Sequence, residues 1–502
     1  MRLHPFDIPE VLDKIVACLD TGDIKSCIYV SKAFHEAFIR FLWKTINVDT
    51  PNWSAVDGQT LEKHKHYIEE IYFTYRYAEH ILLLRGCSRL RKLVSRRDKS
   101  QRFEDLLYRL SNLMIANNFK LQECEINWAH EKGTWTYRAK DFYNAVLQCP
   151  HLRELKLHDF IIHAEEIDLF FRMCSQLEIL ELTRVDIPQW AVGKLIGNLG
   201  ADVGTAAGAF AFGYLLELTL CETKVIGPHP ISEAHSLVTF IQSCPNLRSL
   251  TFYDGATEDM VDFCRTLAPA LESLPHLESL IIPEAELNDK KLAAFLGKMN
   301  RLRKLHAWQS DFGPLCLAEL LKPRGPLNGG TRFCDMIEDL SAPTFDFTDR
   351  VIPVLLSSCR NLTLLETSVA RITDIITGQE WVCSKLQRLE LSLVLDVYND
   401  EERKAKQRIL FERLGKLTKL QELHITTGYS LTLDAGLDKL INLKRLRYLA
   451  FHHGAHFIGP DEAVWMVENW PCLEEVIGLK DKDPAAVGSI AGIFNRRGII
   501  YH

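Results

Sequence analysis

The chain has 502 residues, more than one compact core usually fills, so it either divides into domains or grows as a repeat. Its hydrophobic content of 47%, charged content of 25% and net charge of −7 are ordinary for a globular protein and argue against a nucleic-acid or membrane-surface binder. Acidic residues interrupt the N-terminus where a signal peptide has its apolar core, and no apolar run reaches the roughly 20 residues that span a bilayer. We therefore expect a soluble cytoplasmic or nuclear protein whose 14 cysteines are reduced thiols.

Residues 6–46 have the apolar spacing of three short helices. Pro9 suits the first turn of the first helix, where a missing N–H costs little, and Asp23 is the expected N-cap of the second helix. A piece of about forty residues is too small to be stable alone, so this segment should lean on a partner. The apolar side chains that we expect to be exposed are Ile8, Pro9, Val11, Leu12, Ile15 and Ile24.

The next residues, 47–67, form a connecting segment. "INVDT" is expected to form a first strand and "PNWSAVDGQT" a loop. The stretch "HYIEEIYFTY" then has Ile68, Ile71 and Phe73 at the spacing of an early repeat.

One phrase, Leu-x-x-Leu-x-Leu, recurs roughly every 24 to 38 residues, a period typical of leucine-rich repeats. Examples are "CPHLRELKL" from Cys149 and "CPNLRSLTF" from Cys244. In the first of these, Leu155 and Leu157 alternate with polar residues as in a half-buried strand, so they should point into a core. A single unit cannot bury its apolar side alone, and the units must therefore stack.

A cysteine often precedes the phrase. The stretches 163–174 and 233–244 have helical apolar spacing, and Cys174 and Cys244 end them. In other units the same position holds Leu274, Met299, Leu417, Leu443 or Trp470. Leucine cannot replace a zinc ligand but can replace a packing residue, so we interpret the cysteines as buried packing residues and expect neither a metal nor a cofactor.

The pattern of the repeats resembles leucine-rich repeats of the cysteine-containing type, over roughly residues 65–480. The N-terminal segment resembles an F-box of the kind found with such repeats in fungal-type proteins. The residues that carry the second resemblance are Ile8-Pro9-Glu10-Val11-Leu12, Ile15, Leu19, Asp23-Ile24, Cys27, Val30-Ser31-Lys32, Phe34 and Leu42-Trp43. Ile8 stands for the usual leucine, and Ser31 stands where the family often has a second cysteine.

The resemblance implies an α/β fold: a short all-helical F-box followed by a curved solenoid with parallel strands on its concave face. It also implies the substrate-recognition subunit of an SCF-type cullin-RING ubiquitin ligase, which docks a Skp-family adaptor and has no catalytic residues of its own. The implied adaptor-binding residues are Ile8, Pro9, Val11, Leu12, Ile15, Leu19, Ile24, Cys27 and Val30. Three alternatives stay open: an N-terminal segment that only caps the repeats, a scaffold outside ubiquitination, and a small-ligand receptor with a pocket in the solenoid.

A target protein should contact the outward positions of the strands, on the concave face. The candidates are Lys156, His158, Tyr253, His306, Trp308, Arg388, His424 and His452. Tyr253 and Trp308 are the foremost, because aromatic residues dominate interface energies, although either could instead pack sideways on a neighbouring strand. The mixture of signs on this face predicts no simple target charge.

Five further stretches have features of their own. Gly200–Phe210 and the stretch from Lys322 are interpreted as loop insertions, and Arg85–Arg102 as a basic run that is either a solvated loop or a nuclear-import or acidic-partner patch. The group His452, His453 and His456 is set aside as a metal site because His452 faces outward in the repeat register. The last residues should form a helix and a strand. The expected domains are 1–46 for the F-box, 47–67 for the connection, 68–480 for the repeats and 481–502 for a C-terminal cap.

Overall fold

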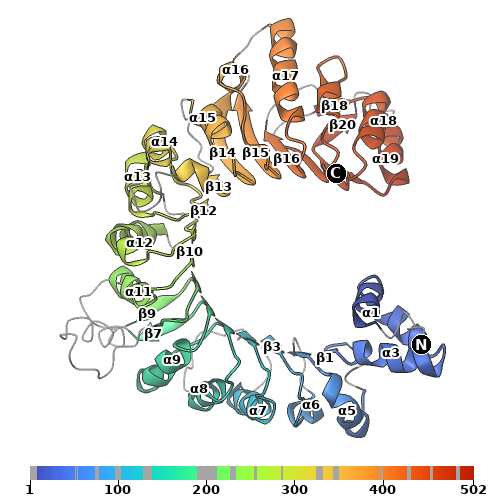
Figure 1. The fold of residues 1–502 in the computed structure, drawn as a ribbon, viewed down its shortest axis with the longest axis vertical. Coiled ribbons are helices and arrows are strands. Elements are labelled where there is room, and N and C mark those ends of the chain that lie inside the picture. The colour runs from blue at the N-terminus through green and yellow to red at the C-terminus, as the bar shows by residue number, and fades with distance from the viewer. Residues whose placement is uncertain are drawn as a thin grey trace. The chain divides into compact units, whose positions relative to one another are not determined.

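The computed structural model describes residues 8–501 apart from 51–52, 54, 74–77, 97–102, 128–137, 189–211, 227–232, 254–256, 284–285, 324–331, 343–349, 395, 397–398, 427–430, 453–455 and 482–486. The chain forms two compact units, Met1–Leu247 and Arg248–His502, called unit 1 and unit 2 below. Each unit combines parallel strands with helices (Figure 1), which confirms the predicted α/β leucine-rich-repeat fold class.

Unit 1 begins with three helices, α1 (Pro9–Val16), α2 (Thr21–Ile28) and α3 (Lys32–Leu42). Pro9 stands in the first turn of α1, as predicted. The N-cap of α2 is Asp20 rather than Asp23, so that prediction was wrong. Asp20 accepts a hydrogen bond from the Asp23 amide at 2.8 Å, and the Asp23 carboxylate accepts one from the Asp20 amide at 3.2 Å. The two carboxylates thus form a reciprocal capping box, and Asp23 is its inner member.

Ser31 begins α3 by accepting a hydrogen bond from the Phe34 amide at 3.2 Å. A serine oxygen is a good acceptor at a helix start, whereas a cysteine sulfur is a weak one. This local cap gives a physical reason for serine at the position where the F-box pattern often has cysteine.

The rest of unit 1 is a ladder of parallel strands joined by helices. The strands are β1 (Thr45–Asn47), β2 (Glu70–Phe73), β3 (Lys92–Arg96), β4 (Glu123–Asn127), β5 (Glu154–His158), β6 (Ile179–Thr183) and β8 (Glu217–Cys221). A short pair, β7 (Asp186–Pro188) and β9 (Lys224–Ile226), runs beside them. The helices are α5 (Gly58–His64), α6 (Glu79–Leu82), α7 (Phe103–Ala116), α8 (Lys140–Leu147), α9 (Ile167–Cys174) and α11 (Glu233–Gln242).

Unit 2 repeats the scheme. Its ladder contains β10 (Ser249–Tyr253), β11 (Ser279–Ile281), β12 (Lys304–His306), β13 (Asp339–Ala342), β14 (Leu364–Arg371), β15 (Arg388–Val394), β16 (Glu422–Thr426), β17 (Tyr448–His452), β19 (Glu475–Ile477) and β21 (Ile500–Tyr501), with β18 (His456–Ile458) paired to β20 (Leu479–Asp481). Its helices are α12 (Thr257–Ala270), α13 (Asp289–Lys298), α14 (Pro314–Leu321), α15 (Val351–Ser358), α16 (Ile372–Thr377), α17 (Asp400–Gly415), α18 (Pro460–Asn469) and α19 (Val487–Arg496).

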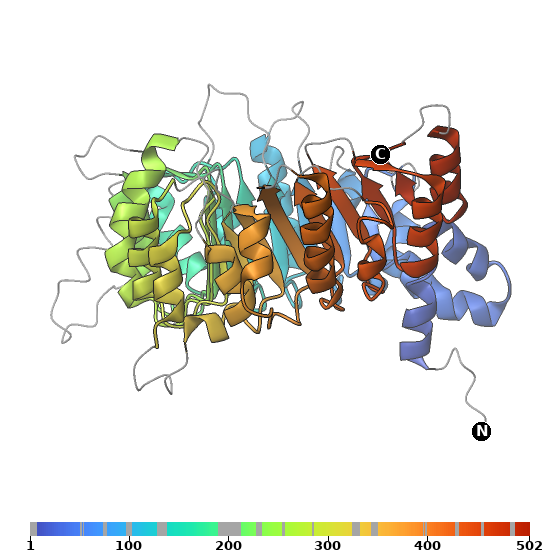
Figure 2. The same ribbon diagram turned by 90° about the horizontal axis from the view of Figure 1, so that it is seen from above.

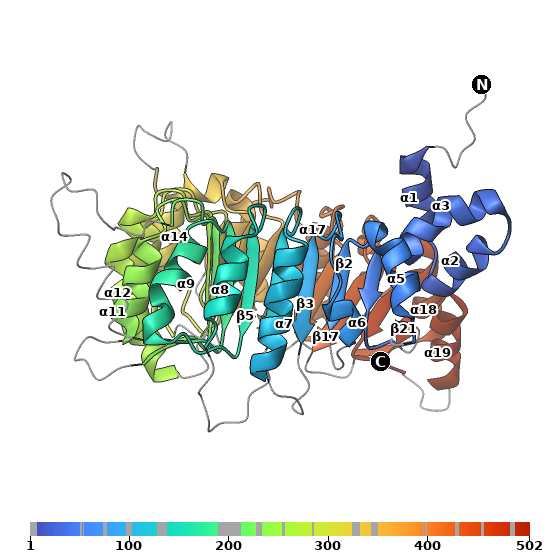
Figure 3. The ribbon, with the colours of Figure 1, turned by 90° about the horizontal axis from the view of Figure 1, so that it is seen from below.

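In each unit the repeat helices cover one side of the strands (Figures 1 and 2), and we call the other side the inner face. Figure 3 shows α7, α8 and α9 next to one another over the ladder of unit 1. The leucines of the repeated phrase fill the space between helices and strands. Leu155 lies in register with Leu180 and Leu157 with Leu182, and all four are fully buried. Each such burial contributes about 1.5–3 kcal/mol, which is why the units stack.

The cysteine position is buried in both units, as predicted. Cys149, Cys174 and Cys244 are fully buried. Leu274 and Trp470, which hold the same position in other repeats, are also buried. Cys174 is the last residue of α9, whereas Cys244 follows the last residue of α11 by two. The predicted first strand and early repeat are present as β1 and β2, and the predicted final helix and strand as α19 and β21. The four-domain division itself stays a prediction.

Candidate protein-binding surfaces

The helices α1–α3 form a small core of their own. Leu12 is 2% exposed and Ile24 8% exposed, and Ile28, Phe38 and Ile39 are buried with them. The expectation that Leu12 and Ile24 are exposed was therefore wrong. A cluster of three short helices must bury some of its apolar stripe to hold together, and these two residues serve that purpose.

Trp43 joins this helical segment to the first repeat. It is buried, its ring stacks on His64 of α5 at 4.6 Å between centroids, and it meets the edge of Trp53 at 5.1 Å. Burial also lowers the pKa of His64, so this ring is neutral near pH 7. The segment is thus fixed to the repeats by an aromatic contact at its C-terminal end.

Other apolar residues of the segment stay in solvent. Pro9 is exposed, Val11 and Ile15 are each 36% exposed, and Val30 is 65% exposed. Val11 and Ile15 lie one turn apart on the same side of α1. Ile8, Leu19 and Cys27 are half-buried. Exposed apolar side chains that gather on one small segment are typical of a surface that a partner covers.

The structure adds Tyr29, which is 86% exposed and stands just before Val30 in the link between α2 and α3. The sequence reasoning missed Tyr29 because this residue belongs neither to a helical apolar stripe nor to the F-box pattern. The one feature of the sequence that could have indicated Tyr29 is its position beside Val30 in the link between two predicted helices.

On the inner face of unit 1, the outward positions of β5 are half-buried. Lys156 on β5 pairs with Glu154 at 3.0 Å and with Glu181 on β6 at 3.5 Å. Burial lowers the pKa of His158, although Glu181 and Glu125 beside it favour its charged form. Both residues alternate with the buried Leu155 and Leu157 of β5, so they lie on the inner face beside charged residues of neighbouring strands. Their contact with a target protein stays a prediction.

This face has an acidic excess that the sequence alone did not indicate. The strand register places six carboxylates and three cations at its outward positions, 3 − 6 = −3 in charge. The carboxylates are Glu70, Glu123, Glu125, Glu154, Glu181 and Glu217, and the cations are Lys92, Arg96 and Lys156. The register decides this sum, because it selects which charged residues of each repeat face the same side.

On the inner face of unit 2, β12–β16 bring His306, Arg388 and His424 onto one side of the ladder. Arg388 pairs with Glu366 at 2.7 Å and with Glu422 at 3.3 Å. Burial lowers the pKa of His306. His424 stacks on Tyr448, with 4.8 Å between ring centroids.

Trp308 lies two residues after the end of β12 and is 45% exposed. Its indole N–H donates to the Ser341 hydroxyl on β13 at 2.6 Å, so the ring leans toward the neighbouring strand while part of it stays open to a partner. Tyr253 ends β10 and is half-buried. His452 ends β17, and its side chain is not among the groups that the structure describes.

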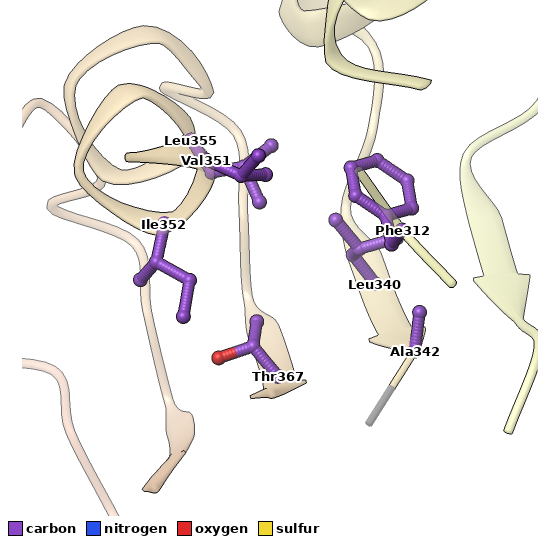
Figure 4. Close-up of a pocket in the computed structure, with 7 residues that line it drawn as sticks. All are labelled: Phe312, Leu340, Ala342, Val351, Ile352, Leu355 and Thr367. Atoms are coloured by element: carbon purple, nitrogen blue, oxygen red, sulfur yellow. The ribbon is translucent and has the colours of Figure 1, made fainter. Parts of the chain in front are cut away.

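A small apolar gap lies inside unit 2, between β13, β14 and α15 (Figure 4). The gap is lined by Phe312, Leu340, Ala342, Val351, Ile352, Leu355 and Thr367. Its volume of about 10 Å³ holds at most about one water molecule. This gap is therefore a packing defect, and it gives no support to a small-ligand receptor.

Several predictions fall on residues outside the described ones. These are the insertion Gly200–Phe210, most of the insertion from Lys322, residues 97–102 of the basic run, and His453 of the histidine group. Over the described residues, His, Cys, Asp and Glu do not gather in any group of three or more that could hold a metal ion. Within the same part of the chain no helix has the length and apolarity needed to cross a membrane.

No protein-family model matches this sequence, and no curated protein matches it. Among solved structures, the chain is similar to one described as a TLR13–ssRNA13 complex, with a TM-score of 0.39 and 14% identity. That match covers 89% of this chain and 56% of the other, so this chain spans little more than half of that protein's length. It is also similar to the structure of a Rad7 and Elc1 complex in yeast, with a TM-score of 0.36, 13% identity, and coverage of 94% of this chain and 89% of the other. Likenesses this weak carry no argument about function.

Proposed function

We propose that this chain is the substrate-recognition subunit of an SCF-type cullin-RING ubiquitin ligase, with α1–α3 docking a Skp-family adaptor and the repeats binding a target protein. The observation that carries the proposal is the exposed apolar set Val11, Ile15, Tyr29 and Val30, on a helical segment fixed directly to a leucine-rich-repeat ladder. The F-box resemblance of the same segment agrees with this observation.

Such a subunit acts by bringing the target and the ubiquitin-charged enzyme close together. An apolar helix face that enters a partner's groove supplies affinity through a few buried anchors, and Val11 and Ile15 are such anchors on α1. A target held on the repeats then stays near the ubiquitin-charged enzyme, which raises the effective concentration of the reacting groups. The acidic excess on the inner face of unit 1 favours a target segment that carries lysine or arginine.

The test is binding of the full chain to a purified Skp-family adaptor, alone and with cullin. In the variant Val11→Glu with Ile15→Glu, two carboxylates replace the anchors, and burying them unpaired should weaken adaptor binding by about a hundredfold or more. The matched control is Phe119→Glu, an exposed apolar residue of the repeats, which should bind like the wild type.

Leu12 is unsuitable for this test, because it lies in the helical core and its replacement would unfold α1–α3. Equal adaptor binding by the wild type and the Val11/Ile15 variant would refute the docking surface. Binding of the adaptor without recruitment of cullin would instead favour a scaffold outside ubiquitination. Absence of adaptor binding by the wild type would leave α1–α3 as a cap of the repeats.

A further inference from the structure

A basic hollow lies where the helical segment meets the first repeats, and the proposed function does not use it. Its volume is about 530 Å³, within the usual range of small-ligand sites. The wall comes from α1, α3 and the residues that precede β2 and β3, elements that are labelled in Figure 3. Its charged lining residues are Asp13, Arg40, Lys44, Glu69, Arg89 and Arg91.

The sheet fixes part of this cluster. Lys44, Glu69 and Arg91 stand at equivalent positions just before β1, β2 and β3. The Glu69 amide donates to the Lys44 carbonyl at 2.9 Å, and the Arg91 amide donates to the Glu69 carbonyl at 2.7 Å. These backbone bonds stack the three residues one repeat apart, so their side chains project from one rigid edge of the ladder.

The hollow is lined by four cationic side chains and two carboxylates, a net charge of 4 − 2 = +2. The ion pairs present are long: Arg40 to Asp13 at 3.5 Å, and Lys44 and Arg91 each to Glu69 at 3.8 Å. Charge-assisted hydrogen bonds are usually about 2.7–2.9 Å, so these cations keep donors available. Arg89 is exposed and makes no ion pair with a described residue.

Arg40 supports the same conclusion. Its guanidinium carbon lies 4.5 Å from the centroid of the Phe41 ring, and its Nε is buried and has no hydrogen-bond partner among the described groups. A buried donor without a partner costs free energy unless a ligand or water accepts from it. Val16, Ala17, Phe41 and Tyr67 complete the wall with apolar and aromatic surface.

We propose that this hollow binds an organic phosphate. A phosphomonoester carries about −1.5 to −2 charges at pH 7, which matches the local excess of two positive charges, and arginine pairs are suited to its oxygens. The attached organic group lies against Val16 and Phe41. This chemistry belongs equally to a phosphorylated side chain of a bound protein and to a free small organic phosphate.

The hollow and the adaptor surface are on opposite sides of α1. Successive helical residues are about 100° apart, so Asp13, Val16 and Ala17 face away from Val11 and Ile15. The two proposals can therefore be tested independently. The variant Val11→Glu with Ile15→Glu should still bind phosphate, and variants of the hollow should still bind the adaptor.

The experiment is titration calorimetry on the full chain at low salt. The probes are O-phosphoserine, a ten-residue phosphoserine peptide, its unphosphorylated counterpart, and inorganic phosphate. Phosphoserine and the phosphopeptide should bind, and the unphosphorylated peptide should not. Tighter binding of the phosphopeptide than of phosphoserine assigns the site to a phosphorylated protein; equal binding assigns it to a small organic phosphate. Inorganic phosphate that binds as tightly as phosphoserine would overturn the organic assignment, because Val16 and Phe41 would then contribute nothing.

Three variants make the test specific. Arg89→Ala with Arg91→Ala should weaken binding at least about tenfold, while Arg85→Ala, an exposed arginine of the same segment outside the hollow, should leave it unchanged. Glu69→Gln removes the carboxylate that competes for Lys44 and Arg91, so it should tighten binding about threefold. Unfolding midpoints check that each variant is folded. Equal weakening by Arg85→Ala, weaker binding by Glu69→Gln, or no binding of any phosphate probe at millimolar concentration would overturn the site.

Discussion

The cysteine position shows how a single residue type fits the repeat. Cys149, Cys174 and Cys244 fill the space that leucine, methionine or tryptophan fills in other repeats, at the end of a helix and under the strand. Burial raises the pKa of Cys149 to about 12 and that of Cys383 to about 11. These thiols are therefore uncharged near neutral pH, and they pack as small apolar groups.

The burial of the thiols predicts which cysteines react. Cys18 and Cys472 are exposed, Cys27 and Cys221 are partly covered, and the other ten are buried. At pH 8 in the native state, an alkylating reagent should modify Cys18 and Cys472 in a fast phase, because a thiolate must be accessible to react. The measurement is the rate and number of thiols modified, with all 14 expected to react in denaturant. A fast phase that persists in Cys18→Ser with Cys472→Ser would contradict the burial of the remaining thiols.

At the scale of helices, neighbouring repeats share their caps. The Asp289 carboxylate, in the first turn of α13, accepts from the amides of Gly313 at 3.0 Å, Leu315 at 2.8 Å and Cys316 at 2.9 Å, at the start of α14. A Cβ at Gly313 would lie 2.6 Å from this carboxylate, so any larger residue there would displace the Asp289 side chain. In unit 1, Glu166 accepts in the same way from the amide of Lys140, the first residue of α8, at 2.9 Å. One side chain thus satisfies the start of a helix in another repeat.

Replacement of this shared cap should be costly. Asp289→Ala leaves the first amides of α14 without their acceptor and should lower the free energy of unfolding by about 1–3 kcal/mol at pH 7. Urea unfolding measures this effect. The matched control is Asp434→Ala, an exposed aspartate whose carboxylate makes no hydrogen bond or ion pair with a described residue. An Asp289→Ala midpoint equal to that of the control would contradict the capping role.

The same contact has a predicted pH dependence. Burial alone would raise the pKa of Asp289, but the hydrogen bonds from Cys316, Leu315 and Gly313 outweigh it and lower the pKa below its usual 3.8. A carboxylate with a lowered pKa in the folded state stabilises the fold above its unfolded pKa and loses this contribution as pH falls further. The difference between wild type and Asp289→Ala should therefore be complete at pH 7 and should shrink below about pH 4.

At the scale of the whole molecule, both ladders hold a histidine on the inner face in neutral form. Burial is the largest cause that lowers the pKa of His158 in unit 1 and of His306 in unit 2. The pKa of His158 is raised by the nearby charges of Glu181, Glu125 and Asp159 and lowered further by Arg184. The pKa of His306 is raised by Glu366 and Asp339 and lowered further by Lys304 and Arg388. At these two histidines the unfolded chain thus binds more protons than the folded one as pH falls through 6.5.

The free energy of unfolding should therefore decrease as pH falls from 7.5 to 5.5, through the unfolded pKa of histidine near 6.5. Urea midpoints at the two pH values measure the decrease. His158→Gln with His306→Gln keeps a polar side chain but removes the titration, so its decrease should be smaller. The same decrease in wild type and variant would show that these two histidines do not cause it.

The sequence by itself determined the parts of this protein that follow from local periodicity. The alternation around Leu155 and Leu157 predicts a half-buried strand wherever it stands, and the recurrence of the phrase requires stacking, because one unit has nowhere to bury its apolar side. The helical spacing of residues 6–46 likewise predicted three helices, which the structure has between Pro9 and Leu42. The exchange of Cys174 for Leu274 or Trp470 elsewhere predicted a buried packing position.

Only the tertiary structure decided which side of each element meets which neighbour. Leu12 and Val11 are adjacent apolar residues of one helix, and packing against the other two helices alone makes the first a core residue and the second a surface one. Asp289 reaches α14 from 24 residues earlier in the chain. Lys44, Glu69 and Arg91 become neighbours because backbone bonds between strands stack them, a relation of register that no local pattern encodes.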